Sequence, residues 1–208
     1  MARLDEGQGQ FERVVHALKS YRGVICIAGA AGVGKTLLVE RIVQQMDTGF
    51  HFSFLHASCM QAPHDITQKG KIAVLVVDQA EQLSAADLLW LKQCAPTTRI
   101  ILVARKIGVV TSHFSMSCYI RLAALKSSEV GAYCAHRLRV AGCADNMLIS
   151  HTVIPCLAYY AKRRPQRINH ILREALIFAY KNGYKHVNKP SLIHGFGLVQ
   201  KADVAGQI

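Results

Sequence analysis

The sequence contains no long hydrophobic run. Its unbroken apolar stretches, such as Ile72–Val77, are far shorter than the roughly 20 residues that a membrane-spanning helix needs. The opening residues Met1–Gly7 are polar and acidic, whereas a secretory signal peptide would be basic and then apolar. We therefore expect no transmembrane segment, no export and a cytoplasmic location.

Paired cysteines are also missing. The seven cysteines are an odd number, are scattered along the chain and include no Cys-x-x-Cys spacing. Such usage is typical of a reducing compartment, and it offers neither a disulfide framework nor a tetrahedral zinc site. Cys26 and Cys118 stand in apolar runs, where a cysteine usually acts as a small buried hydrophobic residue.

Acidic residues are few. The chain has 13 Asp and Glu against 25 Lys and Arg, a net charge of +12, while 51% of its residues are hydrophobic, which is too many for a disordered chain. The excess of basic over acidic residues is concentrated in residues 121–208, which hold 13 basic and 4 acidic residues. The chain is expected to fold and to meet an anionic ligand or partner.

Short apolar runs alternate with helical patterns over the first part of the chain. Strands are expected at 23–28, 50–56, 72–77 and 100–103, with a candidate fifth at 117–122. Helices are expected at about 7–20, 35–46 and 85–93. This alternation predicts an α/β fold with a parallel sheet of about five strands, covered by helices on both faces.

The strand pattern stops near residue 125, and helical patterns follow. Residues 127–140 and 147–160 are expected to be helical, and an apolar stripe predicts a third helix from Pro165 to Gly183. Residues from Asn188 onward are expected to form a short tail. We therefore predict two domains, a nucleotide-binding α/β domain over 1–125 and a helical domain with a basic surface over 126–208.

A glycine-rich loop stands between the first expected strand and the helix at 35–46. Its sequence, GAAGVGKT, fits the phosphate-binding pattern GxxxxGK[ST] in the strand–loop–helix context that the pattern requires. Small residues let backbone N–H groups and the helix N-terminus face a β-phosphate. The lysine supplies charge to the β- and γ-phosphates, and the threonine hydroxyl can ligate Mg²⁺. The alternative is a plain glycine turn with an exposed lysine. The residues expected to bind ATP are Gly29, Ala30, Ala31, Gly32, Val33, Gly34, Lys35, Thr36 and Leu37.

A carboxylate ends the strand at 72–77. Asp78 is placed to anchor Mg²⁺ beside the phosphate loop, together with Thr36, although an aspartate there can also be a turn residue. The next residue, Gln79, is an amide where an active ATPase usually has a glutamate, and an amide can orient a water but cannot take its proton. Glu81 is open to two roles, a helix cap or a relocated base. With Lys35, these are the candidate catalytic residues.

These motifs, in this order, resemble a known family. The phosphate loop, the segment Asp78–Leu83, the stretch HRLRVAG at 136–142 and the stretch PQRIN at 165–169 are similar to AAA+ ATPases of the ExeA/GspA type, which are linked to bacterial type II secretion and pilus machinery. TniB-like transposition ATPases are more distant relatives. The resemblance covers nearly the whole chain. It implies ATP as ligand, a sheet core with a helical lid, assembly into homo-oligomers and a protein partner in a secretion or pilus machine.

The sequence also departs from that family. Where the family has Asp-Glu-Ala-Gln, this chain has the acid and the amide exchanged. The lid arginine that follows the proline corresponds to Gln166, which leaves Arg164 or Arg167 to reach the nucleotide. Arg105 occupies the place of a polar sensor residue after the fourth strand, and a plain surface arginine is the alternative. The resemblance therefore supports nucleotide binding better than turnover, and ATPase activity is left open.

Three functions remain open at this point. The first is a Mg-ATP-binding AAA+ switch that hydrolyses slowly. The second is a DNA-binding AAA+ ATPase of the transposition-helper or origin-recognition kind, supported by basic residues near the carboxyl terminus. The third is a structural module with a vestigial loop. The basic residues in question are Lys162, Arg163, Arg164, Arg167, Arg173, Lys181, Lys185 and Lys189.

Overall fold

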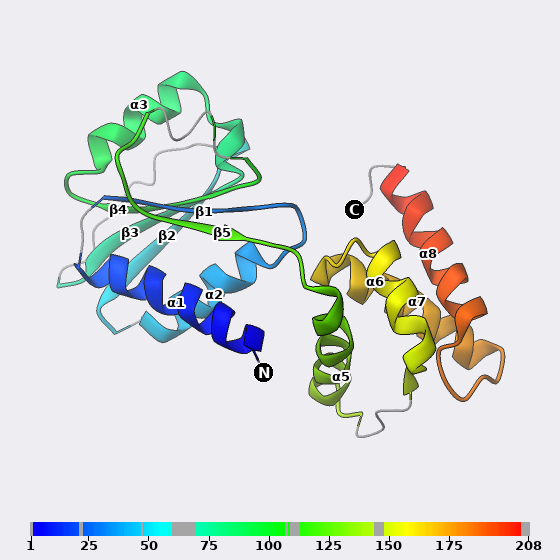
Figure 1. The fold of residues 1–208 in the computed structure, drawn as a ribbon. Coiled ribbons are helices and arrows are strands. Elements are labelled where there is room, and N and C mark those ends of the chain that lie inside the picture. The colour runs from blue at the N-terminus through cyan, green and yellow to red at the C-terminus, as the bar shows by residue number, and fades with distance from the viewer. Residues whose placement is uncertain are drawn as a thin grey trace. The chain divides into compact units, whose positions relative to one another are not determined.

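The computed structural model describes residues 2–20, 23–46, 48–59, 70–106, 108, 113–143 and 148–204, with residues 2–8 and 204 as backbone alone. The chain divides into two compact units, Met1–Ala123 and Ala124–Ile208 (Figure 1). In the described part of the chain, no helix combines the length and apolar character needed to cross a bilayer.

The first unit is built on a five-stranded parallel sheet. The strands are β1 (Val24–Gly29), β2 (Phe50–His56), β3 (Ile72–Asp78), β4 (Arg99–Ala104) and β5 (Met116–Leu122). Their order in the sheet is β2-β3-β4-β1-β5, and every neighbouring pair is parallel. All five expected strands are present at their expected places, so the predicted fold class is confirmed.

Helices cover both faces of this sheet (Figure 1). α1 (Ala2–Ser20) and α2 (Lys35–Met46) lie on one face, and α3 (Ala85–Cys94) lies on the other. Alternate residues of each strand enter two separate cores: Ile25 and Ile27 pack on the α1/α2 side, while Cys26 packs on the α3 side. Continuous apolar strands are thus explained by burial on both faces.

The second unit is helical. It contains α5 (Val130–Val140), α6 (Ile154–Tyr160), α7 (Pro165–Lys181) and α8 (Lys189–Val204). The predicted helix from Pro165 is confirmed, with its stripe buried at Ile168, Ile171 and Ala175. The prediction at 147–160 is right only for its second half: residue 147 lies outside the described residues, Ile149 bridges to Val187, and a short 3₁₀ turn (His151–Val153) leads into α6.

The expected tail after Asn188 is wrong, because this segment forms α8. The Asn188 side chain begins the helix by accepting hydrogen bonds from the Ser191 amide at 3.0 Å and the Ser191 hydroxyl at 2.7 Å. Two glycines weaken the helical pattern in the sequence. One of them, Gly195, lies against α7 so closely that a Cβ there would be 2.5 Å from the Ile171 carbonyl oxygen. Tertiary packing therefore overrides a low helix propensity.

Candidate nucleotide site

The candidate residues gather where the parallel strands end. Val74 and Val76 pack on the α1/α2 face of the sheet, so Asp78, two residues further along β3, belongs to the same face. The glycine-rich loop follows β1, and Arg105 follows β4. All of them lie at the carboxyl edge of the sheet, where open α/β sheets bind their ligands.

Three glycines of the loop are required by its backbone. A Cβ on Gly29 would lie 2.5 Å from the Leu122 carbonyl oxygen of β5, a distance that side chains do not tolerate. Gly32 and Gly34 have φ angles of 74° and 101°, in the left-handed region that favours glycine. Val33, between them, is buried and fixes the loop to the first unit. The loop is thereby held in one shape.

Lys35 closes the loop from the start of α2. Its ammonium donates hydrogen bonds to the carbonyl oxygens of Gly29 at 2.8 Å and Ala30 at 3.0 Å. The neighbouring Thr36 and Leu37 side chains are exposed. The first turn of α2 contains no acidic residue, so its N-terminal N–H groups and dipole favour an anion. These features fit a polyphosphate accompanied by a divalent cation.

Asp78 and Gln79 occupy fixed positions after β3. One oxygen of the half-buried Asp78 carboxylate accepts a hydrogen bond from the Gln79 backbone N–H at 2.8 Å. Gln79 adopts a left-handed conformation, with φ 55° and ψ 40°. Its side-chain oxygen accepts a hydrogen bond from the Gln82 amide at 2.7 Å. The Gln79 side chain is thus oriented, and its own amide nitrogen is a hydrogen-bond donor.

Glu81 and Arg105 are brought together from positions 24 residues apart. The Glu81 carboxylate accepts the Arg105 backbone N–H at 3.0 Å and lies 3.5 Å from the Arg105 Nε. The Glu81 side chain is only 22% exposed, whereas that of Arg105 is 60% exposed. In this structure Glu81, the candidate relocated base, is therefore engaged by an arginine.

The two candidate lid arginines differ in their surroundings within the second unit. Arg167 Nη1 lies 2.8 Å from a carboxylate oxygen of Asp203, so this side chain joins α7 to α8. Arg164 precedes α7 and is half-buried, and its side chain makes no hydrogen bond or ion pair with the described residues. Gln166, in the first turn of α7, is exposed.

His56 is a residue at this edge that the sequence did not indicate. It ends β2 and lies in register with Asp78 of β3. Its Nδ1 accepts a hydrogen bond from the Ser58 backbone N–H at 3.3 Å and is 2.7 Å from the Ser58 hydroxyl. Since Nδ1 is the acceptor, the neutral ring carries its proton on Nε2. The only sequence signal was a histidine at the end of an alternating strand.

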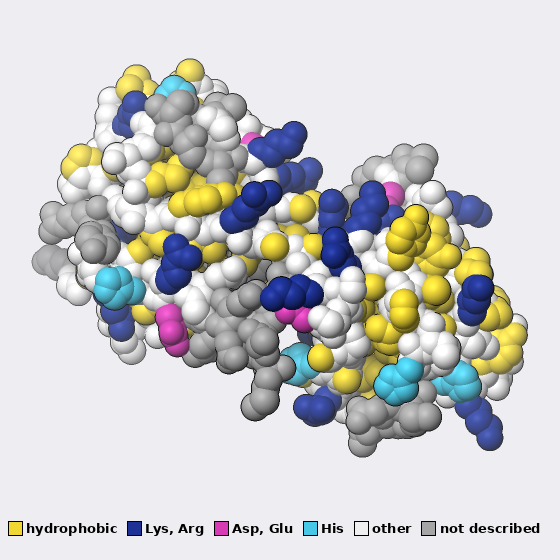
Figure 2. Space-filling model, viewed as in Figure 1, with side chains coloured by type: hydrophobic (Ala, Val, Ile, Leu, Met, Phe, Trp, Pro, Cys, Tyr) yellow, Lys and Arg dark blue, Asp and Glu magenta, His cyan; other side chains and the backbone are white. Residues whose placement is uncertain are grey.

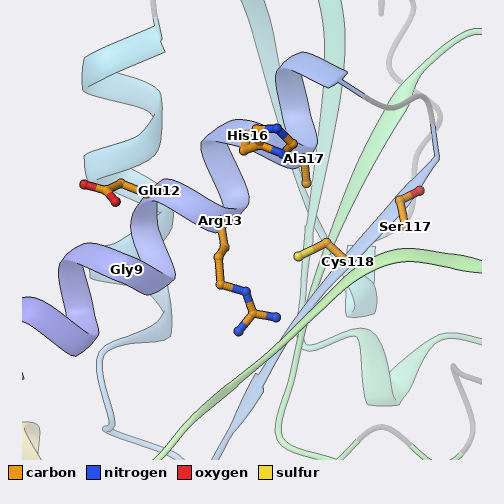
Figure 3. A pocket seen from close by; sticks show the side chains of 7 residues that line it. All are labelled: Gly9, Glu12, Arg13, His16, Ala17, Ser117 and Cys118. Atoms are coloured by element: carbon orange, nitrogen blue, oxygen red, sulfur yellow. The ribbon is translucent and has the colours of Figure 1, made fainter.

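A separate hollow of about 370 Å³ lies between α1 and β5 (Figure 3). Arg13 and His16 line it from α1, and Ser117 and Cys118 line it from β5. Burial raises the pKa of the Cys118 thiol, and the Arg13 charge partly offsets this effect. The hollow is at the amino-terminal half of β5, away from the carboxyl edge, so it is not the candidate nucleotide site.

No protein-family model matches the chain, and no curated protein matches it. Solved structures do match. The RuvB Holliday junction branch migration motor of Thermotoga maritima superposes with a TM-score of 0.70 and 13% identity, over 93% of this chain and 68% of that one. The Orc1 protein of Aeropyrum pernix, solved in complex with DNA, gives a TM-score of 0.70 and 14% identity, over 98% of this chain and 67% of that one.

These likenesses identify the fold. Identities this low show the fold alone, and that fold is the AAA+ P-loop fold: a five-stranded parallel sheet flanked by helices, with a helical region after it. The narrower resemblance to the ExeA/GspA type rests on the sequence motifs.

Proposed function

We propose that this protein binds ATP with Mg²⁺, hydrolyses it slowly and acts as a nucleotide-dependent switch. The observation that carries the proposal is the phosphate loop, whose three glycines and Lys35 hold it in one shape at the same sheet edge as Asp78. The AAA+ fold supports it. A plain glycine turn would need neither the close approach to β5 nor a lysine folded onto the loop.

Binding uses groups that the loop already presents. Backbone N–H groups at the start of α2 donate to phosphate oxygens. The Lys35 ammonium leaves the Gly29 and Ala30 carbonyl oxygens and donates to phosphate oxygens instead. The Thr36 hydroxyl and the Asp78 carboxylate would hold Mg²⁺. When bound, the cation neutralises charge on the phosphate oxygens.

Slow hydrolysis follows from the residues after β3. An attacking water must be oriented and must lose a proton, and Gln79 can do only the first. The acid that could replace it, Glu81, is engaged by Arg105. Arg105 is proposed to sense the terminal phosphate by leaving Glu81. In the lid, Arg164 is a better nucleotide contact than Arg167, because Arg167 would first have to leave Asp203.

The proposed partners follow from the sequence resemblance. It supports homo-oligomers and a protein partner in assembly of a secretion or pilus machine. We also propose a cytoplasmic location, which agrees with the use of ATP and with seven cysteines that form no disulfide.

A second candidate, a DNA-binding ATPase, is favoured by one structural feature. The turn between α6 and α7 exposes Lys162 and Arg163, whose φ angles of 50° and 56° hold both in the left-handed region. Lys and Arg side chains are plentiful on the face seen in Figure 2, and acidic ones are few. RuvB acts on Holliday junctions and Orc1 was solved with DNA, and both share this fold. Duplex DNA is therefore the competing partner.

Steady-state ATPase measured beside ATP binding, with and without duplex DNA, tests the proposal. We expect tight binding with little turnover, and Gln79→Glu should raise turnover about tenfold or more, because a general base contributes about 10²- to 10⁴-fold. Gln93→Glu, the same charge change near the end of α3, is the control and should change nothing. Brisk turnover that collapses in Glu81→Gln and gains nothing from Gln79→Glu would overturn the switch. Several-fold stimulation by DNA would favour the second candidate.

A further inference from the structure

The solvent-facing side of α7 has an unusual composition. Its opposite side is buried in the helical core. The outer side exposes Arg173, Ile177, Tyr180 and Lys181, which helical spacing places on one face. Tyr180 is 87% exposed and Ile177 is 39% exposed. A solvent-facing helical face is ordinarily polar and of mixed charge, so exposed apolar and aromatic side chains among cations need an explanation.

The turn after α7 extends this face. Gly183 has a φ of 70°, and the Tyr184 N–H donates to the Ala179 carbonyl at 2.9 Å, which folds the chain back against the helix end. The Tyr184 ring lies 6.4 Å from that of Phe178 and is 43% exposed. The exposed Lys185 follows. We define the α7 face as Arg173, Ile177, Tyr180, Lys181, Tyr184 and Lys185.

The α7 face is cationic. The one acid in the sequence of α7, Glu174, is half-buried, and Asp203 of α8 is paired with Arg167. Hydrophobic side chains are exposed beside cationic ones on the helical unit in Figure 2. A ligand for this face should combine negative charge with flat apolar surfaces.

We propose that the α7 face binds single-stranded nucleic acid. Tyr180 and Tyr184 stack on unpaired bases, while Arg173, Lys181 and Lys185 contact the phosphates. Exposed rings can stack only on base faces that are open, and a duplex hides those faces within its own stack. A protein partner fits less well because lysine is depleted from protein interfaces. A membrane surface would need a larger apolar area than one isoleucine and two tyrosines.

This site goes beyond the proposed nucleotide function, because its residues belong to neither the phosphate loop nor the residues after β3. It is also distinct from the exposed turn at Lys162 and Arg163, which would meet duplex DNA. Mutations at the two places can therefore distinguish binding of single-stranded nucleic acid from binding of duplex DNA.

Fluorescence anisotropy of the full chain with labelled oligo(dT) and oligo(U) of about 20 nucleotides tests the site. Tyr180→Ala should weaken binding about fivefold or more, because each stacked base contributes at least that much. Tyr180→Phe keeps the ring and should stay within about twofold of the parent. Tyr159→Ala removes a tyrosine that is 81% exposed on α6, outside the α7 face, and should have no effect. Each of Arg173→Ala and Lys181→Ala should reduce the salt dependence of binding by about 0.7 in log–log slope.

Several outcomes decide the matter. Binding of either oligonucleotide that Tyr180→Ala weakens supports the site, and a preference for one of them identifies the strand it takes. Absence of binding overturns it. So does tighter binding to a matched duplex that is lost in Arg163→Glu but kept in Tyr180→Ala. Sedimentation with phosphatidylserine vesicles that depends on Tyr180, without strand binding, would show a membrane surface instead. Lys35→Ala should keep strand binding, so failure of the nucleotide proposal leaves this one standing.

Discussion

We predict that replacing glycine with alanine at two positions of α8 has opposite effects on stability. A Cβ at Gly195 would lie 2.5 Å from the Ile171 carbonyl oxygen and 2.9 Å from the Ala175 amide nitrogen, whereas a Cβ at Gly197 would meet nothing within 4 Å. Both positions are inside one helix, so both gain the same helix propensity, about 0.8–1 kcal/mol, when glycine becomes alanine. The difference in the free energy of unfolding between the two variants therefore measures the effect of α8 packing on α7.

The magnitude follows from what the new methyl group meets. At Gly195 the close atoms belong to the backbone of α7, which can yield only if the two helices separate. Overpacking of this kind costs about 1–3 kcal/mol, and part of that is offset by the propensity gain. We expect Gly195→Ala to lower the free energy of unfolding by up to about 2 kcal/mol. Gly197→Ala should raise it by about 0.8–1 kcal/mol.

Urea unfolding followed by far-UV circular dichroism measures both effects. The single tryptophan, Trp90 of α3, reports on the α/β unit, and its fluorescence is the internal control. Gly195→Ala should shift the helical transition to lower urea concentration and Gly197→Ala to higher. Equal stability of the two variants would refute the reasoning, because it would mean that α8 does not approach α7 as closely as the structure has it.

Two further predictions concern the first unit and the cysteines. Gly29→Ala would place a Cβ 2.5 Å from the Leu122 carbonyl oxygen, so we expect lower stability together with at least about tenfold weaker ATP binding, and parent-like behaviour in calorimetry would count against the loop geometry. Burial raises the pKa of the Cys26 thiol to about 11 and that of Cys134 to about 12, so both stay protonated at neutral to mildly basic pH, where the reactive thiolate is scarce. The exposed Cys59 should therefore be labelled by an aromatic disulfide reagent long before Cys26 and Cys134, and similar rates at all three, read by peptide mass spectrometry, would contradict the buried positions.

The sheet and the phosphate loop could be predicted because their signals are local. Apolar runs such as Ile100–Val103 need burial on both faces, and a buried strand of that length has few alternatives. The loop sequence fixes both its own shape and the strand and helix around it. Every element that the sequence placed in the first unit is present.

What could not be predicted depends on contacts between distant residues. The pair Glu81 and Arg105 joins the ends of two strands that are adjacent only in the folded sheet. α8 is missing from the sequence prediction because its glycines lower the local helix propensity, and only the α7 backbone shows why Gly195 is there. The ion pair between Arg167 and Asp203 could not be predicted for the same reason, because Asp203 belongs to α8.

The most direct test of the central claim is titration calorimetry of Mg-ATP binding. Lys35→Ala removes the ammonium that faces the phosphates, a charge-assisted contact whose loss costs about 2 kcal/mol or more, so affinity should fall at least about tenfold. Lys71→Ala removes an exposed lysine before β3, at the opposite edge of the sheet, and should bind like the parent. Equal affinity of Lys35→Ala and the parent, or a parent chain that does not bind Mg-ATP, would contradict the account.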